Sequence, residues 1–246
     1  MPFVHLPAFL HAVASASACA DTDKSSPSLV GVSVHVAQDS CVIVAANGKA
    51  LAEWSLEVFP DASAAPSLLS LPLGAFILSP QTFQNWGKAA KEQAKARPEW
   101  TPAVATVSQD GQGFTLTHPS GAVEVSRLIV GAFPPYRPAF RAKRTWASFG
   151  NTEWAALAFD SAVVAKAIKG IDAGKEQVEH VIQGGQRGCL LYPMEESRPF
   201  VVSRRGLVMP VGLPDDRRCV PVAPLATSET VDTAETGDHS PKGSTP

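Results

Sequence analysis

The fold is decided by residues 30–58, which read VGVSVHVAQDSCVIVAANGKALAEWSLEV. Apolar residues alternate with small or polar ones in three runs of this stretch: 30–36, 41–45 and 50–58. Such alternation places the apolar side chains on one face of a strand. Gln38-Asp39 and Asn47-Gly48 separate the runs, and pairs of this kind are typical of hairpin turns. The stretch therefore predicts an antiparallel meander of three strands.

A helix is predicted before this meander, over residues 7–20, because apolar residues recur there at helical spacing. They are Leu6, Phe9, Leu10 and Val13. The same order of helix and strands recurs from Ser79, where the helix ends near Pro98, and from Asp160, an N-cap residue. The strands predicted after these helices are 103–107, 113–117, 122–130, 178–183, 189–193 and 200–211. Helix starts roughly every 75 to 80 residues predict an α+β chain of three repeated helix-plus-antiparallel-sheet units.

The composition excludes several classes of protein. The chain has 246 residues, 45% of them apolar, which is enough for sizeable cores, and its net charge of −2 argues against a basic surface over the whole molecule. Its four cysteines lie far apart, so we expect reduced thiols, a cytoplasmic location, and no metal or cofactor. No run reaches the roughly 18 apolar residues of a membrane span. Residues 8–20 are small and apolar like a secretory leader, but no Lys or Arg precedes them, so a helix is expected there.

Lysines gather on the outward faces of the second and third predicted helices. They are Lys88, Lys91 and Lys95 in the second helix, and Lys166 and Lys169 in the third. A helix face with lysine and almost no acid is suited to phosphate contacts that read no bases. The first helix instead has His11 and Ser15 on its outward face. A further basic cluster precedes the third helix: Arg137, Arg141, Lys143 and Arg144.

Enzyme motifs are incomplete in this sequence. Asn47-Gly48-Lys49 lacks the upstream glycine of a phosphate loop, and residues 184–188 lack the strand-then-helix context of a nucleotide site. No HExxH or GxSxG motif occurs. Cys189 with His180 leaves a small Cys/His hydrolase as an alternative, but no enzymatic activity is expected.

Three segments resemble, in the same order, motifs of the β subunit of bacterial DNA polymerase III, the DNA sliding clamp. Residues 31–34 (GVSV) through 45–52 (AANGKALA) resemble its middle domain, and residues 131–137 (GAFPPYR) resemble the end of that domain. Residues 207–211 (LVMPV), with Leu213, are similar to the family's C-terminus. The resemblance covers about residues 5–214. It implies the DNA-clamp fold, in which helices line a channel for DNA and sheets lie outside.

The same resemblance implies two sites. Duplex DNA would contact the helix lysines, together with Arg141, Lys143 and Arg144. A hydrophobic pocket for partner peptides would have a wall of Leu29, Ala46, Gly48, Leu51, Pro134, Val208, Met209, Pro210 and Val211. A methionine among aliphatic residues and prolines adapts to a peptide side chain. Several positions depart from the family, so peptide preference is expected to differ: Asn47, Lys49, Ala50, Pro135, Pro138 and Ala139.

The unit count predicts the organisation of the chain. Residues 1–140 are expected to form a clamp domain of two units, 141–214 a single half-domain, and 215–246 a disordered acidic tail. The resemblance implies twelve units in a closed ring, which four three-unit chains supply, so a homotetramer is favoured and a dimer is the alternative. The expected function is a processivity factor that encircles double-stranded DNA and binds polymerase and clamp-loader subunits through short peptides. A second hypothesis is a clamp-like module that captures these peptides without encircling DNA.

Overall fold

The structure is a computed structural model that describes residues 1–23, 26–65, 67–79, 103–108, 111–117, 123–140, 159–173, 177–182, 188–194 and 198–209. The helices are α1 (Leu6–Ala16) and α3 (Ser161–Gly170), with 3-10 turns η1 (Ser17–Cys19), η2 (Pro27–Leu29) and η3 (Arg137–Phe140). The first strands are β1 (Phe3–His5), β2 (Val32–Val36), β3 (Cys41–Ala46), β4 (Ala50–Leu56), β5 (Leu68–Ser70) and β6 (Gly74–Leu78). The later strands are β7 (Ala103–Val107), β8 (Gly113–Thr117), β9 (Val123–Arg127), β10 (Val178–Ile182), β11 (Cys189–Pro193) and β12 (Val201–Val208).

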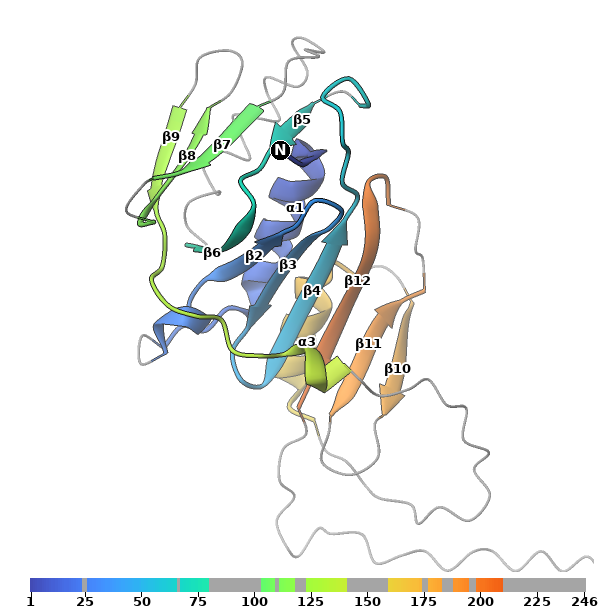
Figure 1. The fold of residues 1–246 in the computed structure, drawn as a ribbon. Coiled ribbons are helices and arrows are strands. Elements are labelled where there is room, and N and C mark those ends of the chain that lie inside the picture. Colours follow the sequence, from blue (N-terminus) through green and yellow to red (C-terminus); the bar gives the residue numbers. More distant parts are fainter. Residues whose placement is uncertain are drawn as a thin grey trace, which may run out of the picture.

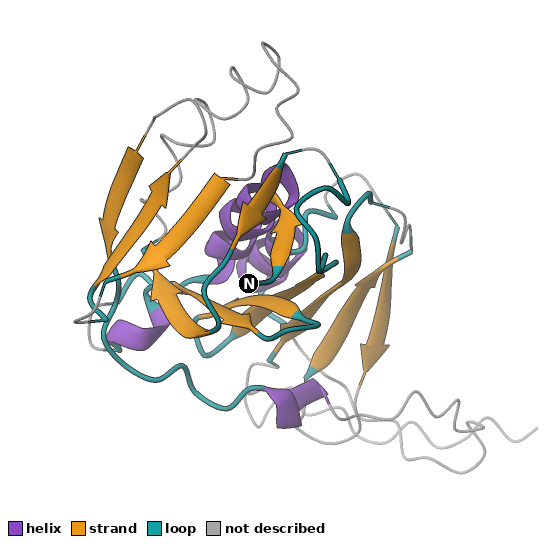
Figure 2. Ribbon diagram, turned by 45° about the horizontal axis from the view of Figure 1, so that its top comes forward, coloured by secondary structure: helices purple, strands orange, loops and turns teal. Residues whose placement is uncertain are grey.

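These strands form two sheets (Figure 1). The five-stranded sheet has the order β1-β5-β7-β8-β9, and the seven-stranded sheet has the order β10-β11-β12-β4-β3-β2-β6. Strands β7 to β9 lie at one end of the molecule and β10 to β12 at the other (Figure 2). Both α1 and α3 lie behind the seven-stranded sheet in Figure 1, whereas η3 lies in front of it. The sheet therefore has a helix-covered face and an outer face.

Helix α1 buries the face that the sequence predicts. Leu6, Phe9, Leu10 and Val13 of α1 are at most 7% exposed. Asp160 caps α3, since its Oδ1 accepts a hydrogen bond from the Ala162 amide at 2.8 Å. The predicted α+β class and the alternation of helix and antiparallel strands are confirmed. The helix predicted between Ser79 and Pro98 and the tail predicted at 215–246 lie outside the described residues.

The predicted strands agree closely with the structure, with three omissions. Strands β7, β8 and β11 have the predicted bounds, and the six other predicted strands differ from them only at their ends. The sequence pattern does not predict β1, β5 and β6. The first two have three residues each, too few to show alternation, and β6 reads GAFIL, in which three consecutive residues are buried.

The pairing of β4 with β12 joins the first and third units. It runs antiparallel from Leu56 opposite Val201 to Ala50 opposite Val208, with an irregularity between Val201 and Ser203. The meander β2-β3-β4 thus continues directly into the meander β12-β11-β10. The boundary at residues 140 and 141 stays a prediction, because residues 141–158 lie outside the described part of the chain.

Gly170, the last residue of α3, lies close to β4 of the sheet. A Cβ added there would lie 2.7 Å from Cys19 Sγ and 2.8 Å from Ala52 Cβ, and the Ala52 atom cannot move without its strand. We expect Gly170→Ala to lower the free energy of unfolding by about 1–2 kcal/mol despite the better helix propensity of alanine. Chemical denaturation measures the change. Gly206→Ala is the control, because a Cβ added at Gly206 meets nothing closer than 3.4 Å. This substitution should therefore lower the free energy of unfolding by less than Gly170→Ala does.

Candidate binding surfaces

An apolar cluster covers part of the outer face of the seven-stranded sheet. Its buried members are Val44, Ala46, Leu51, Phe140, Leu190 and Leu207, and its partly buried members are Leu29, Phe133, Tyr136, Tyr192 and Met209. We call this set the outer apolar cluster. Its members come from β3, β4, β11 and β12, from Met209 directly after β12, from η2, and from the segment 133–140. The cluster therefore spans the joint between β4 and β12.

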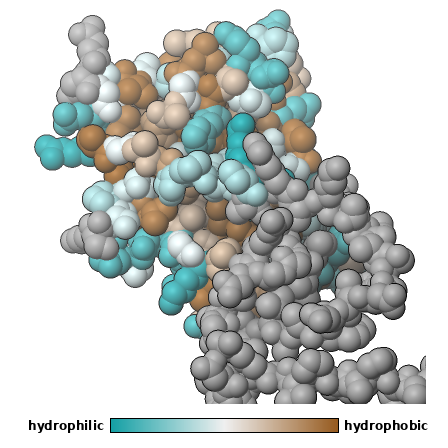
Figure 3. Space-filling view, turned by 60° about the horizontal axis from the view of Figure 1, so that its bottom comes forward, coloured by the Kyte–Doolittle hydropathy of each residue, from teal (hydrophilic) through white to brown (hydrophobic). Residues whose placement is uncertain are grey.

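The surface of the molecule mixes apolar and polar residues. On the face drawn in Figure 3, apolar residues reach the surface among polar ones wherever grey atoms do not cover it. Large apolar side chains that are more than half exposed include Leu73, Val130 and Met194. Isolated apolar residues at a surface are ordinary, so a binding surface has to be argued from residues that pack together. The outer apolar cluster meets that condition.

The segment 133–140 crosses the outer face and supplies the aromatic members of the cluster (Figure 1). The Phe133 and Tyr136 rings meet edge to face with centroids 5.9 Å apart, and Tyr136 meets Phe140 in the same way at 6.2 Å. Edge-to-face pairs at these distances are favourable beyond the area they bury. Burial, followed by the negative charge of Glu53, raises the pKa of Tyr136 to about 12, so its hydroxyl stays protonated.

An ion pair between the buried Glu53 and the partly buried Arg205 lies beside these rings. Arg205 of β12 places Nε and Nη2 each 2.7 Å from Glu53 Oε1 of β4. Glu53 is 6% exposed, and the guanidinium carbon of Arg205 lies 4.0 Å from the centroid of the Phe140 ring. The cation thus neutralises the buried carboxylate and stacks on the aromatic ring. Arg205 therefore links β12 to β4 through Glu53, and links β12 to the segment 133–140 through Phe140.

A short turn places Met209 at the rim of the cluster. Asn47 Oδ1 accepts hydrogen bonds from the amides of Lys49 at 3.0 Å and Ala50 at 2.7 Å, which fixes the turn between β3 and β4. Gly48 takes a φ of 78° there, a left-handed conformation that favours glycine. The Met209 amide then donates to the Lys49 carbonyl at 2.8 Å.

Only part of the predicted pocket wall lies in this cluster. Leu29, Ala46, Leu51 and Met209 belong to it, and Gly48 and Pro134 are exposed. Val208 lies in the core on the helix-covered face, because neighbouring residues of a strand point to opposite faces. Pro210 and Val211 lie outside the described residues. Sequence reasoning missed Leu207, Leu190 and Tyr192, although the alternation of β12 and β11 indicates their common face.

The helix-covered side carries the described part of the predicted DNA surface. Lys166 and Lys169 of α3 are exposed, and so is His11 of α1. The remaining predicted contacts lie outside the described residues: Lys88, Lys91, Lys95, Arg141, Lys143 and Arg144. Whether any of these residues contacts DNA stays a prediction.

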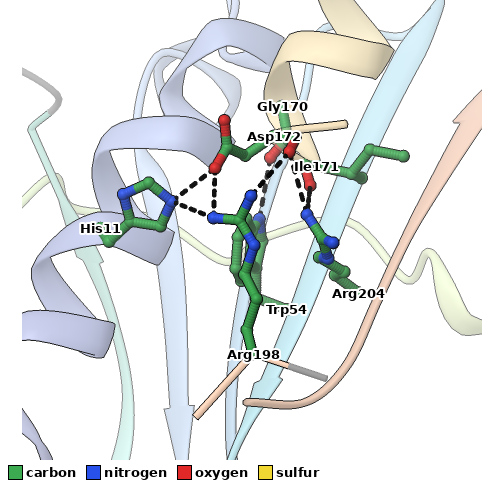
Figure 4. A network of polar contacts seen from close by, with 7 residues as sticks. All are labelled: His11, Trp54, Gly170, Ile171, Asp172, Arg198 and Arg204. Atoms are coloured by element: carbon green, nitrogen blue, oxygen red, sulfur yellow. Dashed lines mark hydrogen bonds and ion pairs between the residues drawn. The ribbon is translucent and has the colours of Figure 1, made fainter. Parts of the chain in front are cut away.

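A polar network that sequence reasoning missed ties α1 to the end of α3 (Figure 4). His11 Nε2 lies 2.7 Å from Asp172 Oδ2, and Arg198 Nη1 is bound to the same oxygen. Arg204 Nη1 donates to the carbonyls of Ile171 at 3.0 Å and Asp172 at 2.9 Å, and thus caps the C-terminus of α3. Trp54 Nε1 donates to the Gly170 carbonyl at 2.8 Å. The network positions both helices on the sheet.

Asp172 gives this network a pH dependence. Burial alone would raise the pKa of Asp172, but its hydrogen bonds with His11 and Arg198 outweigh burial and hold the pKa below the ordinary value of 3.8. The carboxylate therefore stabilises the fold above pH 3.8, and this contribution disappears as pH falls through the lowered pKa. We expect Asp172→Asn to cost about 1 kcal/mol at neutral pH, a modest value because the side chain is 38% exposed. Denaturation at a series of pH values should show the cost shrinking toward zero below pH 3.8.

The Cys189 and His180 pair lacks the properties of a catalytic dyad. Cys189 Sγ lies 3.9 Å from His180 Nδ1 across β10 and β11. However, Cys189 is only 4% exposed, and burial raises the pKa of its thiol. A nucleophilic cysteine requires an accessible thiolate, so this geometry does not favour the hydrolase alternative.

Within the described residues no group of acidic, His and Cys side chains could hold a metal ion. No helix in that part of the chain is long and apolar enough to span a membrane.

Together, the repeated helix-and-meander units, the sheet continuous across two units and the apolar cluster on its outer face define a DNA sliding-clamp fold. Solved structures bear this out. The β subunit of DNA polymerase III from Thermotoga maritima matches with a TM-score of 0.59 and 17% identity over 86% of this chain and 65% of that chain. A DNA polymerase sliding clamp from Pseudomonas aeruginosa matches with a TM-score of 0.60 and 14% identity, over 86% of this chain and 65% of that chain. A sliding clamp from Bartonella birtlesii bound to griselimycin matches with a TM-score of 0.55 and 12% identity, over 86% of this chain and 66% of that chain.

These likenesses concern the fold. No protein-family model matches the sequence, and a comparison with curated proteins finds no match. The chain covers 65% of the length of the first two clamps named above. The fold that the sequence motifs predict is confirmed at identities of 12 to 17%.

Proposed function

We propose that this chain is a sliding-clamp subunit that encircles double-stranded DNA as a homo-oligomeric ring, with a homotetramer favoured. In this proposal the ring holds DNA polymerase and clamp-loader subunits through short peptides bound at the outer apolar cluster. The observation that supports it best is the arrangement of that cluster. It spans the joint of two units on a clamp fold and lies on the face opposite the helices. Peptides and DNA would thus occupy opposite faces of one sheet.

The test of encirclement compares closed and cut DNA. The protein is loaded onto nicked circles and onto the same DNA made linear, and retention is measured after a wash at raised salt. A ring is retained on circles and slides off linear DNA. Equal retention on both would contradict encirclement, and the mass of the free protein in solution gives the number of chains in the ring.

Lys166 and Lys169 are the described residues best placed to contact the DNA backbone. We expect Lys166→Glu with Lys169→Glu to lower duplex affinity irrespective of sequence. The dependence of log affinity on log salt should become shallower by about one unit for each phosphate that the variant no longer neutralises. Fluorescence anisotropy with a labelled duplex at several salt concentrations measures both quantities. Gln177→Glu is the control, because Gln177 is exposed and lies outside α3, so this variant should leave duplex affinity nearly unchanged.

A second candidate function is a clamp-like module that binds the same peptides without encircling DNA. The observation that favours it is the outward face of α1, where His11 is engaged with Asp172 and no lysine is present. Such a module would bind peptides with unchanged affinity in the presence of DNA and would show no preference for circles. Peptide binding together with selective retention on circles would rule it out.

A further inference from the structure

Each of the three meanders ends in a strand whose far edge is not paired within its own meander. β4 ends β2-β3-β4, β12 ends β10-β11-β12, and β9 ends β7-β8-β9. β4 and β12 pair with each other, antiparallel, through their outer edges. In the described part of the chain, β8 is the only strand that pairs with β9. Among the described strands, the joint that two meanders make with each other is thus not made by the third.

The side chains of β9 differ in exposure from those at the joint already made. On the outer face of β4, Leu51 and Glu53 are 5% and 6% exposed. On β9, Val123 and Val125 are 58% and 72% exposed. Proteins usually protect a sheet edge with charge, proline or a covering segment, and exposed β-branched residues favour pairing with another strand. Among the described side chains of the four edge strands, those of Val123 and Val125 are the most exposed large apolar ones.

We propose that the outer edge of β9 pairs antiparallel with the β9 edge of a second copy of this chain, around a two-fold axis. This contact doubles the five-stranded sheet and repeats between chains the joint that β4 and β12 form within one chain. The inference rests on the homo-oligomer of the proposed function and names one of its contacts. Because the contact is isologous, one surface serves both copies.

The sequence of β9 suits this pairing. If the axis passes beside Val125, then Val125 lies opposite the partner's Val125, and Val123 lies opposite the partner's Arg127. Glu124 lies opposite the partner's Ser126. No like charges then face each other directly, and the two valines at the axis form a β-branched cross-strand pair of the kind that stabilises sheets.

Cross-linking at the axis tests the proposal in the full-length chain. In Val125→Cys, the two new thiols lie opposite each other, and directly opposed residues of antiparallel strands have Cβ atoms roughly 4.5–5.5 Å apart. Oxidation or a short thiol-specific cross-linker should join two chains. Val104→Cys is the matched control, because it is 39% exposed in β7 of the same sheet but away from the edge. Cys19, Cys41 and Cys189 are buried, and Cys219 is replaced by serine in both variants.

A charge variant gives a second readout that needs no cross-linking. Val125→Lys would place two ammonium groups beside the axis and should lower the mass of the assembly to about half, while Val104→Lys leaves it unchanged. Cross-linking confined to Val125→Cys, with loss of mass confined to Val125→Lys, supports the proposal. A wild-type oligomer that shows neither effect overturns this contact and leaves the proposed ring standing. A wild-type monomer overturns both.

Discussion

Met209→Glu is expected to weaken the binding of a polymerase- or loader-derived peptide by roughly 100-fold, equivalent to about 3 kcal/mol. Met209 packs at the rim of the outer apolar cluster, and the bond from its amide to the Lys49 carbonyl fixes its place. A carboxylate there would lose water when an apolar peptide side chain covered it, and the guanidinium of Arg205 is already engaged by Glu53. Calorimetry or anisotropy with a labelled peptide measures the loss.

Met194→Glu is the matched control for this variant. Met194 is 63% exposed, follows β11 and is not a member of the cluster, so the same change of charge there should leave peptide affinity nearly unaltered. Retention of the Met209→Glu protein on circular DNA should equal that of the wild type. Equal weakening by both substitutions would indicate a general effect of charge and would contradict a peptide site at the cluster.

Arg205→Ala is expected to lower the free energy of unfolding by about 3 kcal/mol. The substitution leaves Glu53 buried without its cation and removes the guanidinium from the Phe140 ring. It also releases the segment 133–140 from β12, so peptide affinity should fall as well. Urea denaturation gives the stability, and peptide titration of the folded variant gives the affinity.

A double variant separates the charge from the packing. Removing both charges with Glu53→Gln and Arg205→Met leaves no buried ion and keeps a long side chain under Phe140, so most of the missing stability should return. If the double variant is as unstable as Arg205→Ala, the loss comes from the contact with Phe140 and the ion pair contributes little.

Local patterns specify much of the fold. The hairpin pair Asn47-Gly48, the N-cap Asp160 and the apolar stripe of α1 each determine their structure from nearby residues, and each is found as predicted. The joint of β4 with β12 has no such local signal, because it pairs residues about 150 positions apart, such as Glu53 with Arg205. It could be foreseen only from the resemblance to clamps.

The candidate site shows the same division. Met209 and Leu51 entered the predicted wall through motif resemblance, and the structure places both in the cluster. Val208 was carried over with them, but strand alternation sends it to the opposite face. The contacts of Arg205 with Glu53 and Phe140, and of Asp172 with His11 and Arg198, depend on tertiary packing that no spacing in the sequence reveals.

The position of β12 in the seven-stranded sheet has a consequence for how the protein is made. This strand is the last of the described strands in the chain, yet it lies between β11 and β4. During synthesis, β2 to β4 leave the ribosome long before residues 201–208, and the edge of β4 stays open for that time. Until β12 arrives, Glu53 lacks the cation of Arg205, and Leu51 lacks its cross-strand neighbour Leu207. The outer apolar cluster therefore forms only when nearly all of the described chain has been synthesised. If the proposed function holds, a nascent chain binds no polymerase peptide before that point.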